Sequence, residues 1–193
     1  MLRSKIIPAT MAAVIALGVT GGAFAASGGS DNTQEIAAAL GAKTSITQAI
    51  AAAEQQTGGR ALKIGLEMEK GSYLYEITTA SKDKIAEVSV DPTSGKVVRT
   101  DDKGLIARFF DSEDRGKLSE LTASPTTLAA AIAAAEQHTG GKAIEASFDD
   151  EDGSVQFEIE VAKDGLVHKV QIDSASGKVL KVAAAEAGEH DED

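Results

Sequence analysis

Cysteine is absent from this chain of 193 residues, and the absence excludes several kinds of chemistry. No disulfide can form, so packing alone must stabilise the folded protein, even in an oxidising compartment. A thiol nucleophile and a lipid-modified N-terminal cysteine are excluded for the same reason. Histidine is also scarce, with three residues, and aromatic residues make up only 4% of the chain. The common acid–base and stacking side chains are therefore in short supply.

Basic residues are too few to balance the acidic ones. The chain has 19 Lys and Arg residues against 30 Asp and Glu residues, which gives a formal net charge of −11. Binding of nucleic acid depends on neutralising phosphates with cations, so this balance argues against a nucleic-acid partner. Anionic membrane surfaces are disfavoured on the same ground. The charge is compatible with a solvated surface, with attraction of cations, or with a basic protein partner.

The first 25 residues have the three-part organisation of a secretory signal peptide. Arg3 and Lys5 give a positive start, a short apolar run follows over residues 11–19, and small residues end the segment. We expect cleavage between Ala25 and Ala26, because Ala23 and Ala25 supply a small-x-small site. The apolar run is too short for a stop-transfer helix. The alternative is an uncleaved N-terminal anchor, but the flank after the run is small rather than basic. We therefore expect a periplasmic or secreted bacterial protein, with no membrane insertion after cleavage.

An internal duplication dominates the rest of the sequence. The phrase AAAEQQTGG at 51–59 returns as AAAEQHTGG at 133–141, and the same offset of 82 residues aligns SGKV at 94–97 with SGKV at 176–179, without a gap. Two copies of so long a period indicate two small units rather than a solenoid. We place the units at residues 44–100 and 126–183.

Each unit has the pattern of a helix followed by alternating strands. Apolar residues recur at helical spacing from Ile46 and from Leu128, and a glycine pair follows each stripe. Ser45 and Gln48 are expected to form a capping box at the start of the first helix.

Strands with one apolar and one polar face follow each helix, and Met68 falls on the apolar face of the first of them. Asp91 and Asp173 are expected to form the turns before a short fourth strand in each unit, because an Asp side chain can accept hydrogen bonds from the turn backbone. The pattern predicts an α+β fold, in which each helix packs on an antiparallel sheet of three or four strands. Two arrangements remain open: the sheets pair into one larger sheet, or their edges accept a strand from a partner.

The segments outside the two units have less regular patterns. Residues 101–125 are expected to form a linker with short helical pieces. Phe109 and Phe110 in this linker either pack against a sheet or contact a partner protein. Residues 184–193 are expected to form a disordered acidic tail, because they contain too little apolar surface to fold.

No residue pattern supports catalysis, a cofactor or a tight metal site. The three histidines, His138, His168 and His190, do not recur in both units, and a helix C-terminus accounts for His138 without chemistry. The stretch FDDEDGS at 148–154 resembles a calcium loop, but Phe148 and Ile159 stand where ligands would be required. We therefore predict a protein that is not an enzyme, with no catalytic, cofactor-binding or metal-binding residues.

Each unit combines a helix closed by glycine, an alternating hairpin, and a strand that ends in a pattern close to V-D-x-x-x-G-K-V. The residues of this pattern are Val88, Val90, Asp91, Gly95, Lys96 and Val97, with Val170, Ile172, Asp173, Gly177, Lys178 and Val179 in the second unit. In these features the units resemble the PepSY domain, which occurs in propeptides of secreted metallopeptidases and in bacterial envelope proteins. The resemblance implies a non-catalytic module that binds or restrains another envelope or secreted protein, such as a peptidase or a sensor. The alternative is an acidic periplasmic protein that binds cations or a small ligand.

Overall fold

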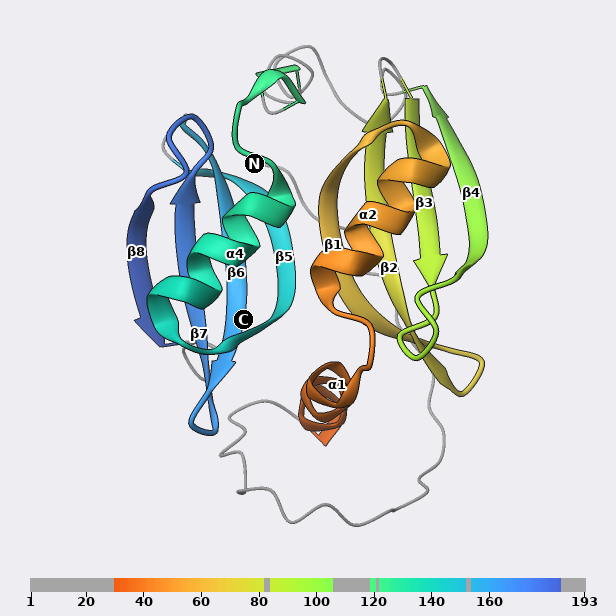
Figure 1. The fold of residues 1–193 in the computed structure, drawn as a ribbon, viewed down its shortest axis with the longest axis horizontal. Helices are drawn as coiled ribbons and strands as arrows, with labels where there is room; N and C mark the ends of the chain where they lie inside the picture. Colours follow the sequence, from red (N-terminus) through yellow and green to blue (C-terminus); the bar gives the residue numbers. More distant parts are fainter. Residues whose placement is uncertain (1–29, 82–83, 106–118, 121, 152–153, 185–193) are drawn as a thin grey trace, which may run out of the picture.

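The computed structural model describes residues 30–81, 84–105, 119–120, 122–151 and 154–184. Each sequence repeat folds as a helix followed by four antiparallel strands (Figure 1). The first repeat contains α2 (Ile46–Thr57), β1 (Arg60–Glu69), β2 (Ser72–Ser81), β3 (Lys84–Val90) and β4 (Val97–Leu105). The second contains α4 (Leu128–Thr139), β5 (Lys142–Glu151), β6 (Ser154–Lys163), β7 (Leu166–Asp173) and β8 (Val179–Ala184). A further helix, α1 (Ser30–Gly41), precedes the first repeat.

The two repeats join edge to edge into one sheet. Its eight strands follow the order β4-β3-β2-β1-β5-β6-β7-β8, with antiparallel neighbours throughout. Helices α2 and α4 lie on the same face, each over its own repeat (Figure 1). The predicted α+β fold is therefore confirmed, and the two units pair through their inner edges, β1 and β5, into one larger sheet whose outer edges are β4 and β8.

The seam between the repeats is the antiparallel pair β1 and β5. Ile64 lies opposite Ala146, and the offset of 82 residues makes these two positions equivalent. A pseudo-twofold axis therefore passes through this pair, perpendicular to the sheet. Both side chains are buried under the helices, which gives the seam an apolar centre.

The helices begin and end as the sequence predicts. Ser45 caps α2 and forms a reciprocal capping box with Gln48, while Thr127 caps α4. Gly58 and Gly140 close the two helices in the left-handed conformation. Equivalent apolar stripes are buried against the sheet; they comprise Ile46, Ala49, Ile50 and Ala53 in α2, and Leu128, Ala131, Ile132 and Ala135 in α4.

The recurring phrase at 51–59 and 133–141 connects each helix to its first strand. Glu54 Oε1 accepts a hydrogen bond of 2.9 Å from the main-chain N–H of Ala61, and the equivalent Glu136 accepts one of the same length from Ala143. Gly59 leaves no space for a side chain, because a Cβ atom would lie 2.7 Å from the carbonyl oxygen of Ala80. The residues of the recurring phrase therefore have structural roles: the glutamate fixes the first strand to the helix, and the glycine allows a close main-chain approach.

Asp91 and Asp173 form equivalent turns after β3 and β7. Asp91 Oδ1 accepts main-chain hydrogen bonds from Thr93 and Ser94, and Asp173 Oδ1 accepts one from Ser176. The main-chain bond from Ser94 is the main reason that the pKa of Asp91 is lowered, whereas for Asp173 the hydroxyl of Ser176 lowers the pKa most, followed by its main-chain N–H; each bond favours the ionised carboxylate. The prediction that these residues form turns is confirmed.

The structure differs from the expectation at three places. Helix α1 lies before the first predicted unit, in a region for which no helix was predicted. Strand β4 is not short: it has nine residues and continues to Leu105, into the segment expected to be linker. Met68 was expected on the buried face of its strand, but it is 46% exposed because it lies near the end of β1, beyond the cover of the helix.

Arg60 and Lys142 occupy equivalent positions and reach across the seam in opposite directions. Arg60 donates three hydrogen bonds to main-chain carbonyls before α4, and Lys142 donates two to the end of α1, before α2. The acceptors and distances are Thr122 (2.7 Å), Ser124 (2.7 Å) and Thr126 (3.0 Å) for Arg60, and Ala39 (3.3 Å) and Leu40 (3.1 Å) for Lys142. Each repeat thus holds the segment that leads into the other repeat's helix.

Among the described residues, no single helix is long and apolar enough to cross a membrane. The bent pair of α1 and α2 meets that requirement only by combined length and composition. The apolar stripe of α2 is buried against the sheet, which accounts for its composition within the fold.

Candidate binding surfaces

Strand β8 forms one outer edge of the sheet, and within the described ranges it pairs only with β7. Leu180 and Val182 on this strand are 56% and 42% exposed, and Lys181 is its single charged residue. A free strand edge with exposed apolar side chains is a template on which another strand can pair. The β8 edge is therefore the first candidate binding surface.

Strand β4 forms the opposite edge and carries four charged residues, at positions 99 and 101–103. Arg99 Nη1 lies 2.6 Å from both carboxylate oxygens of Glu69. Three more carboxylates surround its guanidinium group: Glu76 at 3.4 Å, Glu87 at 3.8 Å and Asp101 at 2.9 Å. Charged side chains on an edge strand oppose pairing with another chain, so β4 is protected against the addition of a further strand.

The charge cluster around Arg99 affects its carboxylates differently. The hydrogen bond from Arg99 lowers the pKa of Glu69. Burial raises the pKa of Glu76, and this effect outweighs the nearby Arg99. The second repeat has Lys181 and Ala183 at the positions of Arg99 and Asp101, so this cluster belongs to the first repeat.

The second repeat carries its cation on a different strand. Lys169 on β7 lies 2.9 Å from Glu158 and 4.0 Å from Glu160, and it occupies the position equivalent to Glu87. Within the described residues no ion pair joins β7 to β8. The faces of the two repeats therefore differ in charge, and of the two edge strands as far as the structure describes them, β4 is the one that ion pairs join to other strands of the sheet.

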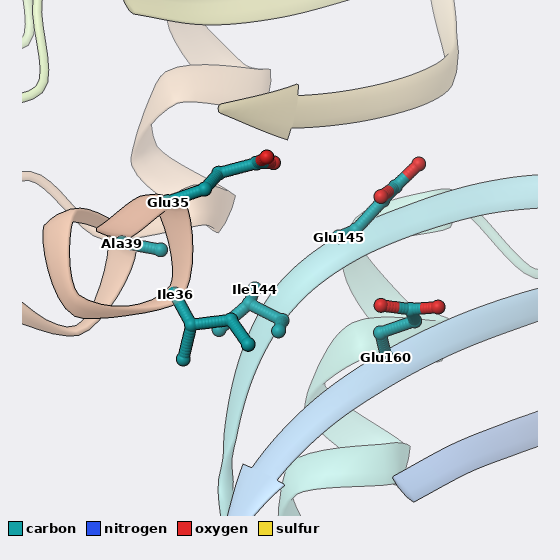
Figure 2. Close-up of a pocket in the computed structure, with 6 residues that line it drawn as sticks. All are labelled: Glu35, Ile36, Ala39, Ile144, Glu145 and Glu160. Atoms are coloured by element: carbon teal, nitrogen blue, oxygen red, sulfur yellow. The ribbon is translucent and has the colours of Figure 1, made fainter. Parts of the chain in front are cut away.

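A second candidate surface lies where α1 meets the seam (Figure 2). A pocket of about 150 Å³ opens there, and Figure 2 shows Glu35 extending from α1 toward Glu145 on β5, with Glu160 on β6 nearby. Apolar residues complete the lining: Ile36, Ala39 and Ile144. Because Glu145 and Glu160 alternate with buried residues that face α4, their carboxylates lie on the face without α2 and α4.

The carboxylates around this pocket perturb one another. Burial, followed by the charges of Glu145, Glu67 and Glu160, raises the pKa of Glu35 to about 7, while Lys63 acts in the opposite direction. Burial is also the main reason that the pKa of Glu160 is raised. Lys63 Nζ lies 3.4 Å from Glu145 Oε1, so its charge is already paired with that carboxylate. The pocket thus favours a protonated carboxyl group on α1.

A second pocket, of about 250 Å³, lies near the end of α2 in the first repeat. Its lining is largely polar and includes Gln56, Thr57, Thr79, Ala86 and Thr100. In the second repeat the positions of Gln56 and Ala86 are occupied by His138 and His168. His138 and His168 therefore occupy positions equivalent to two residues that line the same pocket in the first repeat, although the histidines lie far apart in the sequence.

Several residues singled out from the sequence lie outside the described ranges. These are the cleavage-site residues Ala25 and Ala26, the linker residues Phe109 and Phe110, and His190 in the tail. Among the described residues, no group of three or more His, Cys, Asp or Glu side chains is arranged to hold a metal ion. The carboxylates of the α1 pocket were not identified from the sequence, because they come from separate elements.

Comparison with known proteins identifies the family. The profile of the PepSY family, described as "Peptidase propeptide and YPEB domain", matches residues 43–101 and 126–183, and the chain therefore belongs to this family as a tandem PepSY protein. A solved structure of a candidate lipoprotein from Clostridium difficile 630 is similar at 20% identity and a TM-score of 0.44, covering 74% of this chain and 94% of that one. No curated protein matches the sequence significantly.

PepSY is a propeptide or regulatory type of domain and is generally non-catalytic. Membership of the family indicates a non-catalytic module of an extracytoplasmic protein. The matched ranges include α2, α4 and the larger part of every strand, but they exclude α1. Helix α1 therefore lies outside the matched units, whereas the strand residues that line its pocket, Ile144, Glu145 and Glu160, lie within the second unit.

Proposed function

We propose that this chain is a binding module of the bacterial envelope whose β8 edge receives an extended segment of another secreted or envelope protein, such as a peptidase or a sensor. The observation that carries the proposal is the contrast between β8, with exposed Leu180 and Val182, and the charged edge β4. Main-chain hydrogen bonds would supply the affinity, and side chains on alternate positions would supply the specificity.

The partner segment is expected to be basic. The chain has a net charge of −11, and five of its acidic residues follow β8 in the sequence, at positions 186, 189 and 191–193. Opposite charge accelerates association and selects among partners, especially at low salt. An extended strand in which apolar residues alternate with Lys or Arg fits both the apolar side chains of β8 and the net negative charge of the chain.

Matched substitutions in the two edge strands test this proposal. Val182 and Thr100 are equivalent and both exposed, so Val182→Lys and Thr100→Lys place the same cation on β8 and β4. The probe is a synthetic peptide in which Val and Lys alternate, with a Val/Glu peptide for comparison. Fluorescence anisotropy should show binding of the Lys peptide only, weakened at least about tenfold by Val182→Lys and unchanged by Thr100→Lys.

Two further measurements identify where a partner binds. Amide hydrogen exchange should slow over Val179–Ala184 when the peptide is present, and not over Val97–Leu105. A photo-crosslinking residue at position 182, compared with one at position 100, should capture a secreted or envelope protein in exporting cells. Equal binding of both peptides, or equal protection of both edges, would contradict the proposal.

A further inference from the structure

Helix α1 is held at the seam of the two repeats by three kinds of contact. Ile36 and Ala39 are buried with Ile144 in the apolar core. Lys142 on β5 donates hydrogen bonds to the carbonyls of Ala39 and Leu40 at the end of the helix. Glu35 projects from the same helix into the carboxylate-lined pocket (Figure 2). The first two contacts favour docking of α1, whereas the third depends on the charge of Glu35.

The groups that face Glu35 come from three strands. Glu145 on β5, Glu67 on β1 and Glu160 on β6 are acidic, and Lys63 on β1 is the opposing cation. Lys63 pairs with Glu145, and Lys169 lies beside Glu160, so both cations are shared with carboxylates other than Glu35. An ionised Glu35 therefore meets an excess of negative charge in a partly buried site.

We propose that α1 is a pH-dependent latch, which docks firmly on the β1–β5 seam when Glu35 is protonated and loosens when Glu35 ionises. The direction follows from linkage. Docking raises the pKa of Glu35 from its ordinary value of 4.5 to about 7. The docked state therefore holds its proton more tightly than the released state, and docking weakens as the pH rises from about 4.5 to 7.

Release would uncover apolar surface at the junction of the repeats. Ile36, Ala39 and Ile144 would lose their mutual cover, and the main-chain carbonyls at the end of α1 would lose Lys142. Helix α1 itself lies outside the residues matched by the PepSY family, so its release would displace none of the helices and strands that the match includes. The latch would thus couple external pH to exposure of the seam, independently of the β8 edge.

Single-cysteine variants of the full chain test the latch, since the protein has no native cysteine. Ala39→Cys places a thiol in the buried contact, and Ala37→Cys places one on the exposed side of the same helix. The ratio of their modification rates cancels thiol ionisation and reports undocking. Between pH 5 and pH 8 this ratio should rise by at least about tenfold, because linkage converts a raised carboxyl pKa into weaker docking at higher pH.

Substitutions at Glu35 and its neighbour provide the controls. Glu35→Gln should make the rate ratio low and independent of pH, whereas Gln34→Glu, on the exposed side, should leave the wild-type pH dependence unchanged. Hydrogen exchange of residues 33–41 in the unmodified chain, corrected for intrinsic rates, gives an independent readout should Ala39→Cys disturb folding. A flat pH profile in the unmodified chain, or an undiminished rise in Glu35→Gln, would overturn the proposal.

Discussion

The two outer strands of the sheet occupy equivalent positions, and each exposes an apolar side chain at the same site, Val98 or Leu180, yet they differ in length and in charge. Strand β4 is nine residues long and carries Arg99, Asp101, Asp102 and Lys103. Strand β8 has six residues with a single lysine, and its exposed side chains are mainly apolar. Duplication produced two similar edges, and their sequences now support different behaviour: one edge resists further pairing, and the other can accept it.

The difference shows that shared and divergent residues of the repeats carry different information. Residues retained in both copies, such as Glu54 and Glu136, make the same intramolecular contacts and define the frame, that is, the fold that the two repeats share. Residues that differ, such as Arg99 and Lys181, lie on surfaces where the frame imposes little constraint. Substitutions at equivalent positions can therefore separate frame from surface.

The largest expected difference in stability lies at the two edge cations. Arg99→Ala would leave Glu69, Glu76 and Asp101 without their common partner, and Glu76 is only 8% exposed. We expect the free energy of unfolding to fall by about 2 kcal/mol, less than for a fully buried pair because Arg99 is partly exposed. Lys181→Ala at the equivalent position should change it by less than about 0.5 kcal/mol.

Urea unfolding of both variants at pH 7 measures this contrast. Equal losses would mean that the ion-pair network does not distinguish the two edges. A loss of peptide binding in Arg99→Ala without a loss of stability would assign Arg99 to recognition instead. Arg99→Lys is the conservative control, since it retains the charge but not the contact of one guanidinium group with several carboxylates.

A smaller difference is expected where the repeats hold each other across the seam. Arg60 donates three hydrogen bonds and Lys142 donates two longer ones. Arg60→Ala should lower the free energy of unfolding by about 1.5 kcal/mol, and Lys142→Ala by about 1 kcal/mol, because Arg60 makes more and shorter hydrogen bonds to main-chain carbonyls. Thermal unfolding by calorimetry checks both values, and a greater loss for Lys142→Ala would reverse the inferred asymmetry.

The frame could be predicted from the sequence because its signals are local and occur twice. Ser45 with Gln48, Gly58 and Gly140, and the turns at Asp91 and Asp173 each involve residues close together in the chain. Alternation identified the buried faces of the strands. Pairing of β1 with β5 could not be predicted from the sequence. Main-chain hydrogen bonds join these two strands, and such bonds need no particular side chains. An apolar face under the helices is required whether the two sheets pair or stay separate.

The candidate surfaces were harder to predict because they depend on contacts between distant residues. The apolar side of α1 is short, and its partner Ile144 lies more than a hundred residues away in the chain. The carboxylates that face Glu35 come from β1, β5 and β6, so no spacing relates them. The length of β4 was not predicted because a run of charged residues is typical of a linker. Its charges are compatible with a strand because Arg99 pairs with carboxylates on other strands.

The smallest effect is expected at the aspartates that begin the turns before β4 and β8. Both carboxylates accept main-chain hydrogen bonds, and the pKa of each is lowered from 3.8. Each therefore contributes stability at pH values above 3.8, and that contribution is lost as the pH falls through the lowered pKa of the folded state. Asp91→Asn and Asp173→Asn should cause equal, small decreases in the urea midpoint at pH 7, and none at a pH where both aspartates are protonated.

These paired variants decide where the difference between the edges begins. Equal effects would mean that β4 and β8 start from the same turn, so that their divergence lies in the strands that follow. A much larger effect at Asp173 would mean that β8 depends on its turn for order, since within the described residues it lacks the ion pairs that tie β4 to the sheet. In that case the openness of the β8 edge would reflect a weakly held strand rather than the chemistry of Leu180 and Val182.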